Sequence, residues 1–213
     1  MRRHVESRGQ GGRGSRILTH SMAVETEIKF CVRSVAELES KLKAAGFHLE
    51  TPRTFESNVL YDTPQRTLRM RTEILRVRRY GDICTLTHKR VPTGDTGAEK
   101  HKHRVETETR IADAAAMEEI FASLGLVAAF RYEKWRTEWS DGKGHCVVDE
   151  TPIGIYAELE GTSEWIDRAA ALLGVEESEY STLSYGRLFE QWKLENGSNA
   201  EHLTFAHVLK QDR

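Results

Sequence analysis

The chain has 213 residues, a length that suits one domain with a sizeable core and is short for two. Its 31 Lys and Arg nearly balance its 33 Asp and Glu, and the formal net charge of -2 favours neither a nucleic-acid-binding nor a membrane-surface protein. The three cysteines, Cys31, Cys84 and Cys146, are too widely spaced to predict a disulfide framework or a thiolate zinc site. These cysteines fit a reducing cytosol, so we expect a cytoplasmic protein. No apolar run approaches the roughly 20 residues that span a bilayer, so we expect no membrane partner.

The N-terminal segment, residues 1–22, is rich in Arg, Gly, Ser and His and nearly lacks the apolar residues that a core requires. We interpret it as a disordered extension in preference to a nucleic-acid-binding arm. Regular patterning starts at residue 23, and we expect one domain over residues 23–195. Residues 196–213 show no assignable pattern, so they are expected to form a C-terminal tail.

The first patterned segment, residues 24–31, alternates at period two, which predicts a strand with one charged face. The charged face carries Glu25, Glu27 and Lys29. Apolar residues then recur at helical spacing over residues 35–45. Because Ser34 is a suitable N-cap and Gly46 a suitable stop, a short helix is expected after the strand.

Seven further segments have the period-two character of strands and are separated by turn residues. These predicted strands are 55–61, 74–80, 83–89, 102–111, 132–140, 145–149 and 153–160. Apolar residues at helical spacing predict three more helices, at 112–124, 163–173 and 183–193. The pattern therefore predicts an α+β fold with eight strands, whose helices pack outside the sheet or plug one end of it.

The predicted strands share one unusual feature, because one face of each is repeatedly charged and both signs recur from strand to strand. Beyond the first strand, the charged residues in phase are Arg76, Arg78, Lys89, Lys102, Arg104, Glu106, Glu108, Lys134, Arg136, Glu138, Asp149, Glu158 and Glu160. A solvated face of an open sheet is the usual meaning of such alternation. Here carboxylates gather on some strands and Arg or Lys on others, which indicates a common ligand that carries both metal and negative charge.

A polyphosphate has both needs, because its oxygens bind Arg and Lys whereas its divalent metal ion prefers carboxylate oxygens. A closed eight-stranded barrel has an interior wide enough for side chains or one small ligand, so inward charges from every strand would meet there. Burying so many ionic groups unpaired would be costly, so the interior must be wet. We therefore predict a closed eight-stranded antiparallel β-barrel with peripheral helices and a triphosphate-binding tunnel.

The segment Glu25-Thr26-Glu27-Ile28-Lys29 matches the ExExK signature near the N-terminus of CYTH domains, the triphosphate tunnel metalloenzyme superfamily. That superfamily includes class IV adenylate cyclases, thiamine triphosphatases and inorganic tripolyphosphatases. Further segments resemble the family in the same order, and the ordered set is more specific than ExExK alone. They are Tyr61-Asp62-Thr63, Leu75-Arg76-Val77-Arg78-Arg79, Leu86-Thr87-His88-Lys89, Arg104-Val105-Glu106-Thr107-Glu108, Lys134-Trp135-Arg136, Val148-Asp149 and Ala157-Glu158-Leu159-Glu160.

The resemblance implies site residues of two kinds, around Mg²⁺ or Mn²⁺. A first metal ion, which orients the phosphates, would be held by Glu25, Glu27 and Glu160. A second, which positions or activates the attacking group, would be held by Glu106 or Glu108 with Asp149 and Glu158. Phosphate oxygens would be bound by Arg76, Arg78, Lys89, Lys134 and Arg136. Lys29 would lie near the reacting phosphorus, and Arg104 would either bind phosphate or pair with Glu106.

Three functions stay open for a small-molecule triphosphate substrate. Hydrolysis of tripolyphosphate or an organic triphosphate needs nothing beyond these residues. A class IV adenylate cyclase, which makes cyclic AMP from ATP, would also need an adenine and ribose site that the sequence does not identify. A non-catalytic polyphosphate-binding module would need the cations but not both metal sites. We therefore predict a metal-dependent triphosphatase, a monomer or homodimer, with no nucleic-acid partner.

Overall fold

The computed structural model describes residues 23–92 and 100–209 of the chain. Its strands are β1 (Ala23–Val32), β2 (His48–Asp62), β3 (Ile74–Tyr80), β4 (Ile83–Arg90), β5 (Lys102–Arg110), β6 (Val127–Ser140), β7 (His145–Thr151) and β8 (Gly154–Glu160). Its helices are α1 (Val35–Ala44), α2 (Thr67–Met70), α3 (Ala114–Ser123), α4 (Ser163–Leu173), α5 (Tyr185–Asn196) and α6 (Phe205–Val208), with a 3-10 turn at Glu177–Glu179. The predicted extension, residues 1–22, lies outside the described residues, as do residues 93–99 and 210–213.

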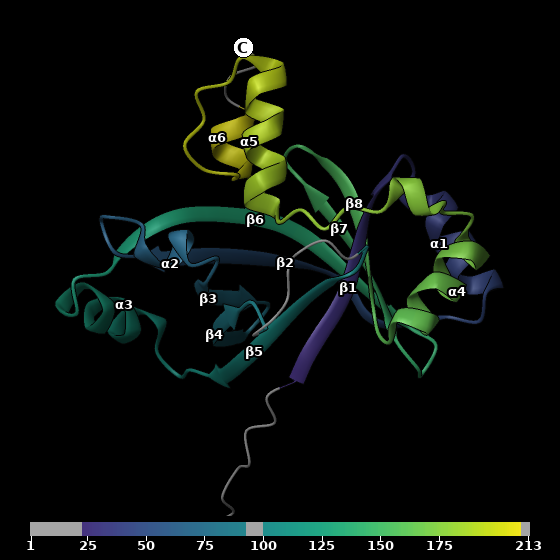
Figure 1. The fold of residues 1–213 in the computed structure, drawn as a ribbon, viewed down its shortest axis with the longest axis horizontal. Coiled ribbons are helices and arrows are strands. Elements are labelled where there is room, and N and C mark those ends of the chain that lie inside the picture. Colours follow the sequence, from purple (N-terminus) through teal and green to yellow (C-terminus); the bar gives the residue numbers. More distant parts are fainter. Residues whose placement is uncertain (1–22, 93–99, 210–213) are drawn as a thin grey trace, which may run out of the picture.

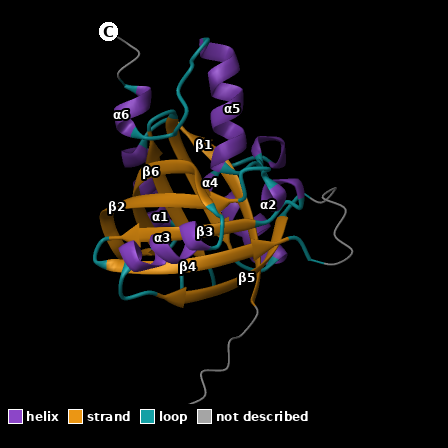
Figure 2. Ribbon diagram, turned by 90° about the vertical axis from the view of Figure 1, so that its left-hand side faces the viewer, coloured by secondary structure: helices purple, strands orange, loops and turns teal. Residues whose placement is uncertain are grey.

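The eight strands close into one barrel in the order β1-β5-β4-β3-β2-β6-β7-β8 (Figures 1 and 2). Every neighbouring pair is antiparallel, including β8 with β1, which closes the ring. The predicted α+β fold, a closed eight-stranded antiparallel barrel with peripheral helices, is therefore confirmed. Among the described residues, no helix is long and apolar enough to cross a lipid bilayer.

Two strands, β2 and β6, begin well before the residues at which the sequence pattern predicts their start. The strand β2 begins at His48, whereas alternation predicts a start at Phe55. Its pairing with β6 shifts register on both sides of Thr51, and Pro52 lies within the second irregularity, where a strand tolerates a residue without an N–H. Likewise β6 begins at Val127, whereas alternation predicts a start at Tyr132, because the first residues of the strand include alanines that favour strands weakly and hide the pattern. Such irregular strand ends lack the period-two signal.

Two predicted helix boundaries have the expected chemistry. The side-chain oxygen of Ser34 accepts a hydrogen bond from the backbone N–H of Glu37, which caps α1. Gly46 follows α1 with a φ of 87°, a left-handed conformation that glycine adopts without steric cost. The short helices α2 and α6 were not predicted, because four-residue helices carry no periodicity to detect.

The hydrophobic core lies largely outside the barrel wall. Because Glu27 and Lys29 face inward, the alternate residues Ile28 and Phe30 face outward. On this outer side, α1 and α4 cover β1, β6, β7 and β8 (Figure 1). The helix α3 covers β2, β3 and β4 in the same way, with Phe121 as its buried anchor. Peripheral helices therefore supply the apolar burial that a charged barrel interior cannot.

The helix α5 stands over one end of the barrel (Figures 1 and 2). Its Tyr185 and Phe189 pack with Tyr132 of β6 in a cluster that also contains Leu203 and Val208. The segment after α5 returns to β6, where Leu203 exchanges backbone hydrogen bonds with residues 131 and 133. The segment predicted as a tail is thus packed against the barrel and α5 through Ala200, Leu203 and Val208.

The ring of Trp165 lies against Gly144, and a Cβ added at that glycine would meet ring atoms at 2.6 Å. The ring is 4% exposed, and its Nε1 donates to Asp141 at 2.9 Å, so it has little room to move. Gly144→Ala should therefore lower the free energy of unfolding by about 1–3 kcal/mol in urea titrations. The control Gly186→Ala, in helix α5 with its nearest atoms at 3.9 Å, should be neutral or raise it by up to about 1 kcal/mol. Equal effects in the two variants would contradict this account of Trp165.

Candidate functional site

The barrel interior contains a cavity of about 580 Å³, which lies in the range of roughly 300–1,000 Å³ typical of small-molecule sites. Residues from all eight strands and the start of α5 line it. The strand alternation seen in the sequence produces this lining, because every second side chain of a barrel strand points inward. The expected site residues on the lining are Glu25, Glu27, Lys29, Arg76, Arg78, Lys89, Glu106, Glu108, Lys134, Arg136, Glu158 and Glu160. Arg104 and Asp149 are the expected residues that do not line it.

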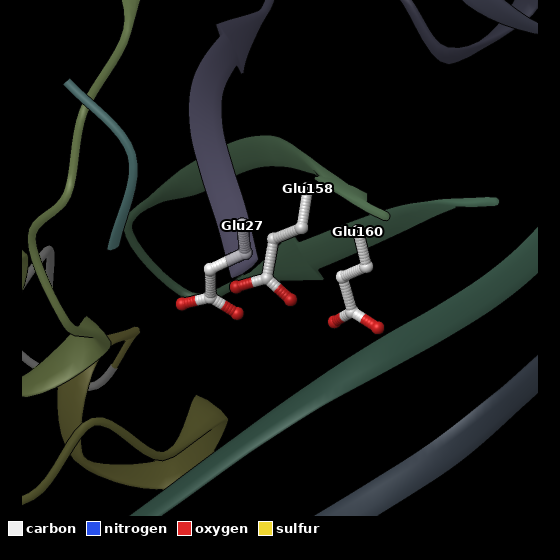
Figure 3. A group of neighbouring side chains, drawn as sticks. All are labelled: Glu27, Glu158 and Glu160. Atoms are coloured by element: carbon white, nitrogen blue, oxygen red, sulfur yellow. The ribbon is translucent and has the colours of Figure 1, made fainter. Parts of the chain in front are cut away.

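Three carboxylates converge on one side of the cavity. Glu27 on β1 and Glu160 on β8 are direct cross-strand partners, and Glu158 precedes Glu160 by one inward position. One oxygen from each can be chosen so that all three lie within 4.8 Å of one another. Figure 3 shows the three side chains pointing the same way from their two neighbouring strands. Burial, together with the negative charges of Glu158 and Glu27, raises the pKa of Glu160 to about 7.

This donor set fits a hard divalent cation. Mg²⁺ and Mn²⁺ prefer carboxylate oxygens, and a cation would relieve the repulsion that raises the pKa of Glu160. The grouping differs from the expectation, which placed Glu158 with a second metal ion. The β1–β8 register explains the difference, since it brings Glu158 beside Glu27 and Glu160. Glu25, expected with this group, instead lies 3.0 Å from the ammonium group of Lys89.

Lysines pair with the carboxylates of the cavity. Lys102 forms an ion pair with Glu27, Lys29 with Glu158, and Lys89 with Glu106. Burial alone would lower the pKa of Lys29, but the charges of Glu158 and Glu27 raise it, so it stays protonated. A bound cation would have to compete with these ammonium groups for the same oxygens.

A second, cationic side of the cavity is organised by Asp149 and adjoins the carboxylates, since Arg136 also donates from Nη2 to Glu158 at 2.8 Å. Arg136 binds the carboxylate of Asp149 with two hydrogen bonds, from Nε at 2.7 Å and Nη2 at 2.6 Å, and Lys134 donates at 2.8 Å. Tyr185 of α5 donates its hydroxyl to the same carboxylate at 2.6 Å. Asp149 is fully buried and receives bonds from all three side chains, so it orients the two cations toward the cavity. Arg76 and Arg78 on β3 complete this side.

Two further expected residues lie at the margin of the site. Glu108 accepts a hydrogen bond from Thr87 at 2.7 Å and lies 3.8 Å from the guanidinium of Arg76, with 38% of its side chain exposed. Arg104 donates from Nη1 to the backbone carbonyl of His103 at 2.7 Å. Arg104 was expected either to bind phosphate or to pair with Glu106. It neither lines the cavity nor forms an ion pair with Glu106 among the described residues.

The strand pattern placed Lys102 on the charged face but gave it no role in the site, and it did not single out Glu56 or Tyr185. Glu56 is 0% exposed and lies among the cations, and Lys102 lines the cavity. The predicted strand 55–61 places Glu56 and Asn58 on one face, so its alternation could have identified Glu56 as inward-facing. No sequence pattern could have identified Tyr185, because its position depends on how α5 docks on the end of the barrel.

Comparisons with known proteins agree with this fold. The family model described as CYTH domain matches residues 23–185. Similar solved structures include a Vibrio parahaemolyticus protein described as an adenylate cyclase candidate, with a TM-score of 0.67 and 21% identity over 78% of this chain and 97% of that one. The PH1819 protein of Pyrococcus horikoshii has a TM-score of 0.63 and 26% identity over 78% and 98% of the two chains. No curated protein sequence matches.

A third similar structure is a Hippeastrum protein described as an adenylyl cyclase candidate with a dominant triphosphatase activity. Its TM-score is 0.56, with 20% identity over 78% of this chain and 95% of that chain. At this identity, the likeness shows a shared fold.

The raised pKa of Glu160 predicts a pH-dependent stability of the metal-free chain. The unfolded chain loses this proton near the ordinary pKa of 4.5, whereas the folded chain keeps it to about pH 7. The free energy of unfolding should therefore fall between those pH values by at most about 3 kcal/mol. Glu160→Gln should remove the fall, so that this variant exceeds wild type above pH 7 and approaches it below pH 4.5 in urea titrations. Parallel pH profiles would contradict the assignment.

Divalent cations should stabilise the folded chain through the same carboxylates. Mg²⁺ or Mn²⁺ should raise the thermal unfolding midpoint more at pH 8 than at pH 6, because protons compete for Glu160. Glu27→Gln should remove the gain. The control Glu150→Gln alters a carboxylate that pairs with Arg53 outside the cavity, and it should keep the gain. Loss of the gain in both variants, or in neither, would show that these three carboxylates do not form the metal site.

Proposed function

The chain belongs to the CYTH domain family, and we propose that it is a divalent-metal-dependent triphosphatase that hydrolyses tripolyphosphate or an organic triphosphate. The observation that carries the proposal is the division of one cavity into two sides. Carboxylates converge at Glu27, Glu158 and Glu160, while Arg76, Arg78, Lys134 and Arg136 line an adjoining part of the wall, where Arg136 lies 2.8 Å from Glu158. A triphosphate that carries a divalent cation has the complementary charge distribution.

The residues of the chain divide the work of phosphoryl transfer, in which positioning and charge neutralisation dominate. Arg76, Arg78 and Arg136 would bind phosphate oxygens by paired N–H donation, and Lys89 and Lys134 would act as point charges. Asp149, held by Tyr185, keeps Lys134 and Arg136 in place for that contact. The triphosphate is thereby held in one orientation across the cavity.

The carboxylate side completes the assignment. Glu27, Glu158 and Glu160 would hold a divalent cation, and Glu25 with Glu106 or Glu108 would extend the carboxylate set toward a second one. Such cations supply charge neutralisation at phosphate oxygens and activation of an attacking water. Lys29, at the border between the two sides, stays protonated and would neutralise charge at the reacting phosphorus.

The cyclase reaction is a distinct outcome of the same site, since a ribose hydroxyl would then attack in place of water. The similar fold of the Hippeastrum protein, which is described with a dominant triphosphatase activity, indicates that this barrel can support hydrolysis. A hydrolase needs only the cations and carboxylates of the cavity, so we favour it. A binding module would not need the converging carboxylates.

The first experiment incubates the purified chain with tripolyphosphate, ATP or thiamine triphosphate and with Mg²⁺ or Mn²⁺, and measures phosphate and cyclic AMP in the same samples. We expect phosphate without cyclic AMP. Cyclic AMP with pyrophosphate would assign the cyclase reaction instead. Neither product with any substrate would favour the binding module over both enzymes.

Two variants test the roles of the two sides. Glu27→Gln should lower kcat by a factor on the order of 10²–10³, because it removes charge from the cation-binding side. Arg78→Ala should raise KM by roughly tenfold or more through lost phosphate contact. Thermal unfolding midpoints within a few degrees of wild type would show that folding is intact. Full activity in both variants would refute this site.

A further inference from the structure

Glu56 on β2 is a buried acid that neither the cation-binding nor the phosphate-binding assignment uses. Its Oε1 lies 3.4 Å from the Nζ of Lys134, and its Oε2 lies 3.8 Å from the Nε of Arg136 and 3.9 Å from the Nη1 of Arg78. Burial alone would raise the pKa of Glu56, but the charges of Lys134, Arg136 and Arg78 lower it to about 2. Glu56 is therefore an anion at the centre of the cationic wall.

The contacts of Glu56 are attractive but incomplete. Asn58 donates from Nδ2 to Oε1 at 2.8 Å and holds the carboxylate in place. Among the described residues, Oε2 of Glu56 has no hydrogen-bond partner, and neither do the Nε atoms of Arg76 and Arg78. Native proteins leave few buried polar atoms without a hydrogen-bond partner, so the two unpartnered Nε donors of Arg76 and Arg78 point to an anionic ligand that accepts from them.

Asp149 makes the contrast clear. Its oxygens receive close hydrogen bonds from Arg136, Lys134 and Tyr185, so this acid is part of the fixed scaffold. The cations around Glu56 are held near it by charge and keep N–H groups available. An incoming phosphate can therefore take these donors without breaking a hydrogen bond to Oε2.

We propose that Glu56 is a positioning residue that serves as an internal counter-anion for the phosphate-binding cations. It holds the cations together when no phosphate is bound, and it repels and competes with the phosphate oxygens that bind the same groups. The chain thereby limits its affinity for its substrate and for the anionic products that must leave. The inference rests on the proposed function for the identity of the anion, a triphosphate.

The physical basis is the charge balance of the cationic wall. Glu56 is the acid that Arg78, Lys134 and Arg136 share, whereas Asp149, Glu158 and Glu108 each compensate only part of the cationic group. Removal of the Glu56 charge therefore increases the mutual repulsion of these cations and their attraction for phosphate. Binding the substrate more tightly in its ground state does not raise kcat, so a residue that moderates binding is compatible with turnover.

The test is Glu56→Gln, an isosteric change that keeps an acceptor for Asn58 and removes the charge. Titration calorimetry with inorganic tripolyphosphate, in EDTA and without divalent metal, should show binding at least about tenfold tighter than wild type. The control Glu138→Gln removes a carboxylate that lines the cavity, accepts from Thr51 at 2.6 Å and makes no ion pair with the described cations. It should change affinity much less. Equal affinities for E56Q and wild type, or for E56Q and the control, would overturn the proposal.

Thermal unfolding separates this role from a purely structural one. Without an anion, E56Q should unfold at a lower temperature than wild type, and tripolyphosphate should raise its midpoint by more than it raises that of wild type. A structural role alone would lower both midpoints equally, with and without the anion. If E56Q does not fold on its own, its refolding with tripolyphosphate decides: recovery of folded protein supports the proposal and its absence overturns it.

The calorimetry also separates this inference from the proposed function, because binding in EDTA requires no turnover. Tighter binding by E56Q in a chain that hydrolyses no triphosphate would keep the counter-anion role and defeat the triphosphatase assignment. Hydrolysis by wild type with unchanged affinity in E56Q would keep the triphosphatase assignment and overturn the counter-anion role.

Discussion

The requirement that buried charges be paired governs this molecule. All eight strands direct side chains into one cavity, and many of these side chains are ionic. Burying an unpaired charge costs more than most single contacts contribute, so each must find a partner in the protein, in water or in a ligand. The cross-strand register supplies the pairs, as when Glu27 lies opposite Lys102 on one side and Glu160 on the other.

The same requirement explains why the apolar core lies outside. A barrel of this size usually fills its interior with side chains, but here that space is charged. The outward faces of the strands therefore carry the apolar residues, and helices α1, α3 and α4 cover them. The helix α5 covers an end of the barrel, where the hydroxyl of Tyr185 reaches Asp149. Stability and site geometry thus share the same strands, on opposite faces.

Neither the cationic nor the carboxylate side of the cavity is completely paired. On the cationic side, Asp149 is saturated by hydrogen bonds and orients its cations, whereas Glu56 accepts one hydrogen bond from Asn58 and its Oε2 has no hydrogen-bond partner among the described residues. The carboxylates near Glu160 repel each other despite nearby lysines, which keeps the pKa of Glu160 high. A ligand with both positive and negative parts would complete both sides, and this shared incompleteness links the metal and the phosphate assignments.

The sequence by itself determined the strands, their charged phase and the closed α+β barrel, because period-two alternation and the order of the family segments are local properties. It also identified most of the charged residues that line the cavity, from Glu25 to Glu160. Only the tertiary structure decided which carboxylates meet, since Glu158 joins Glu27 and Glu160 through the β1–β8 register. It alone decided that Tyr185 reaches Asp149 and that Glu56 lies among the cations. The physical reason is that pairings between strands, and the docking of α5, join residues far apart in the chain and leave no periodic signal.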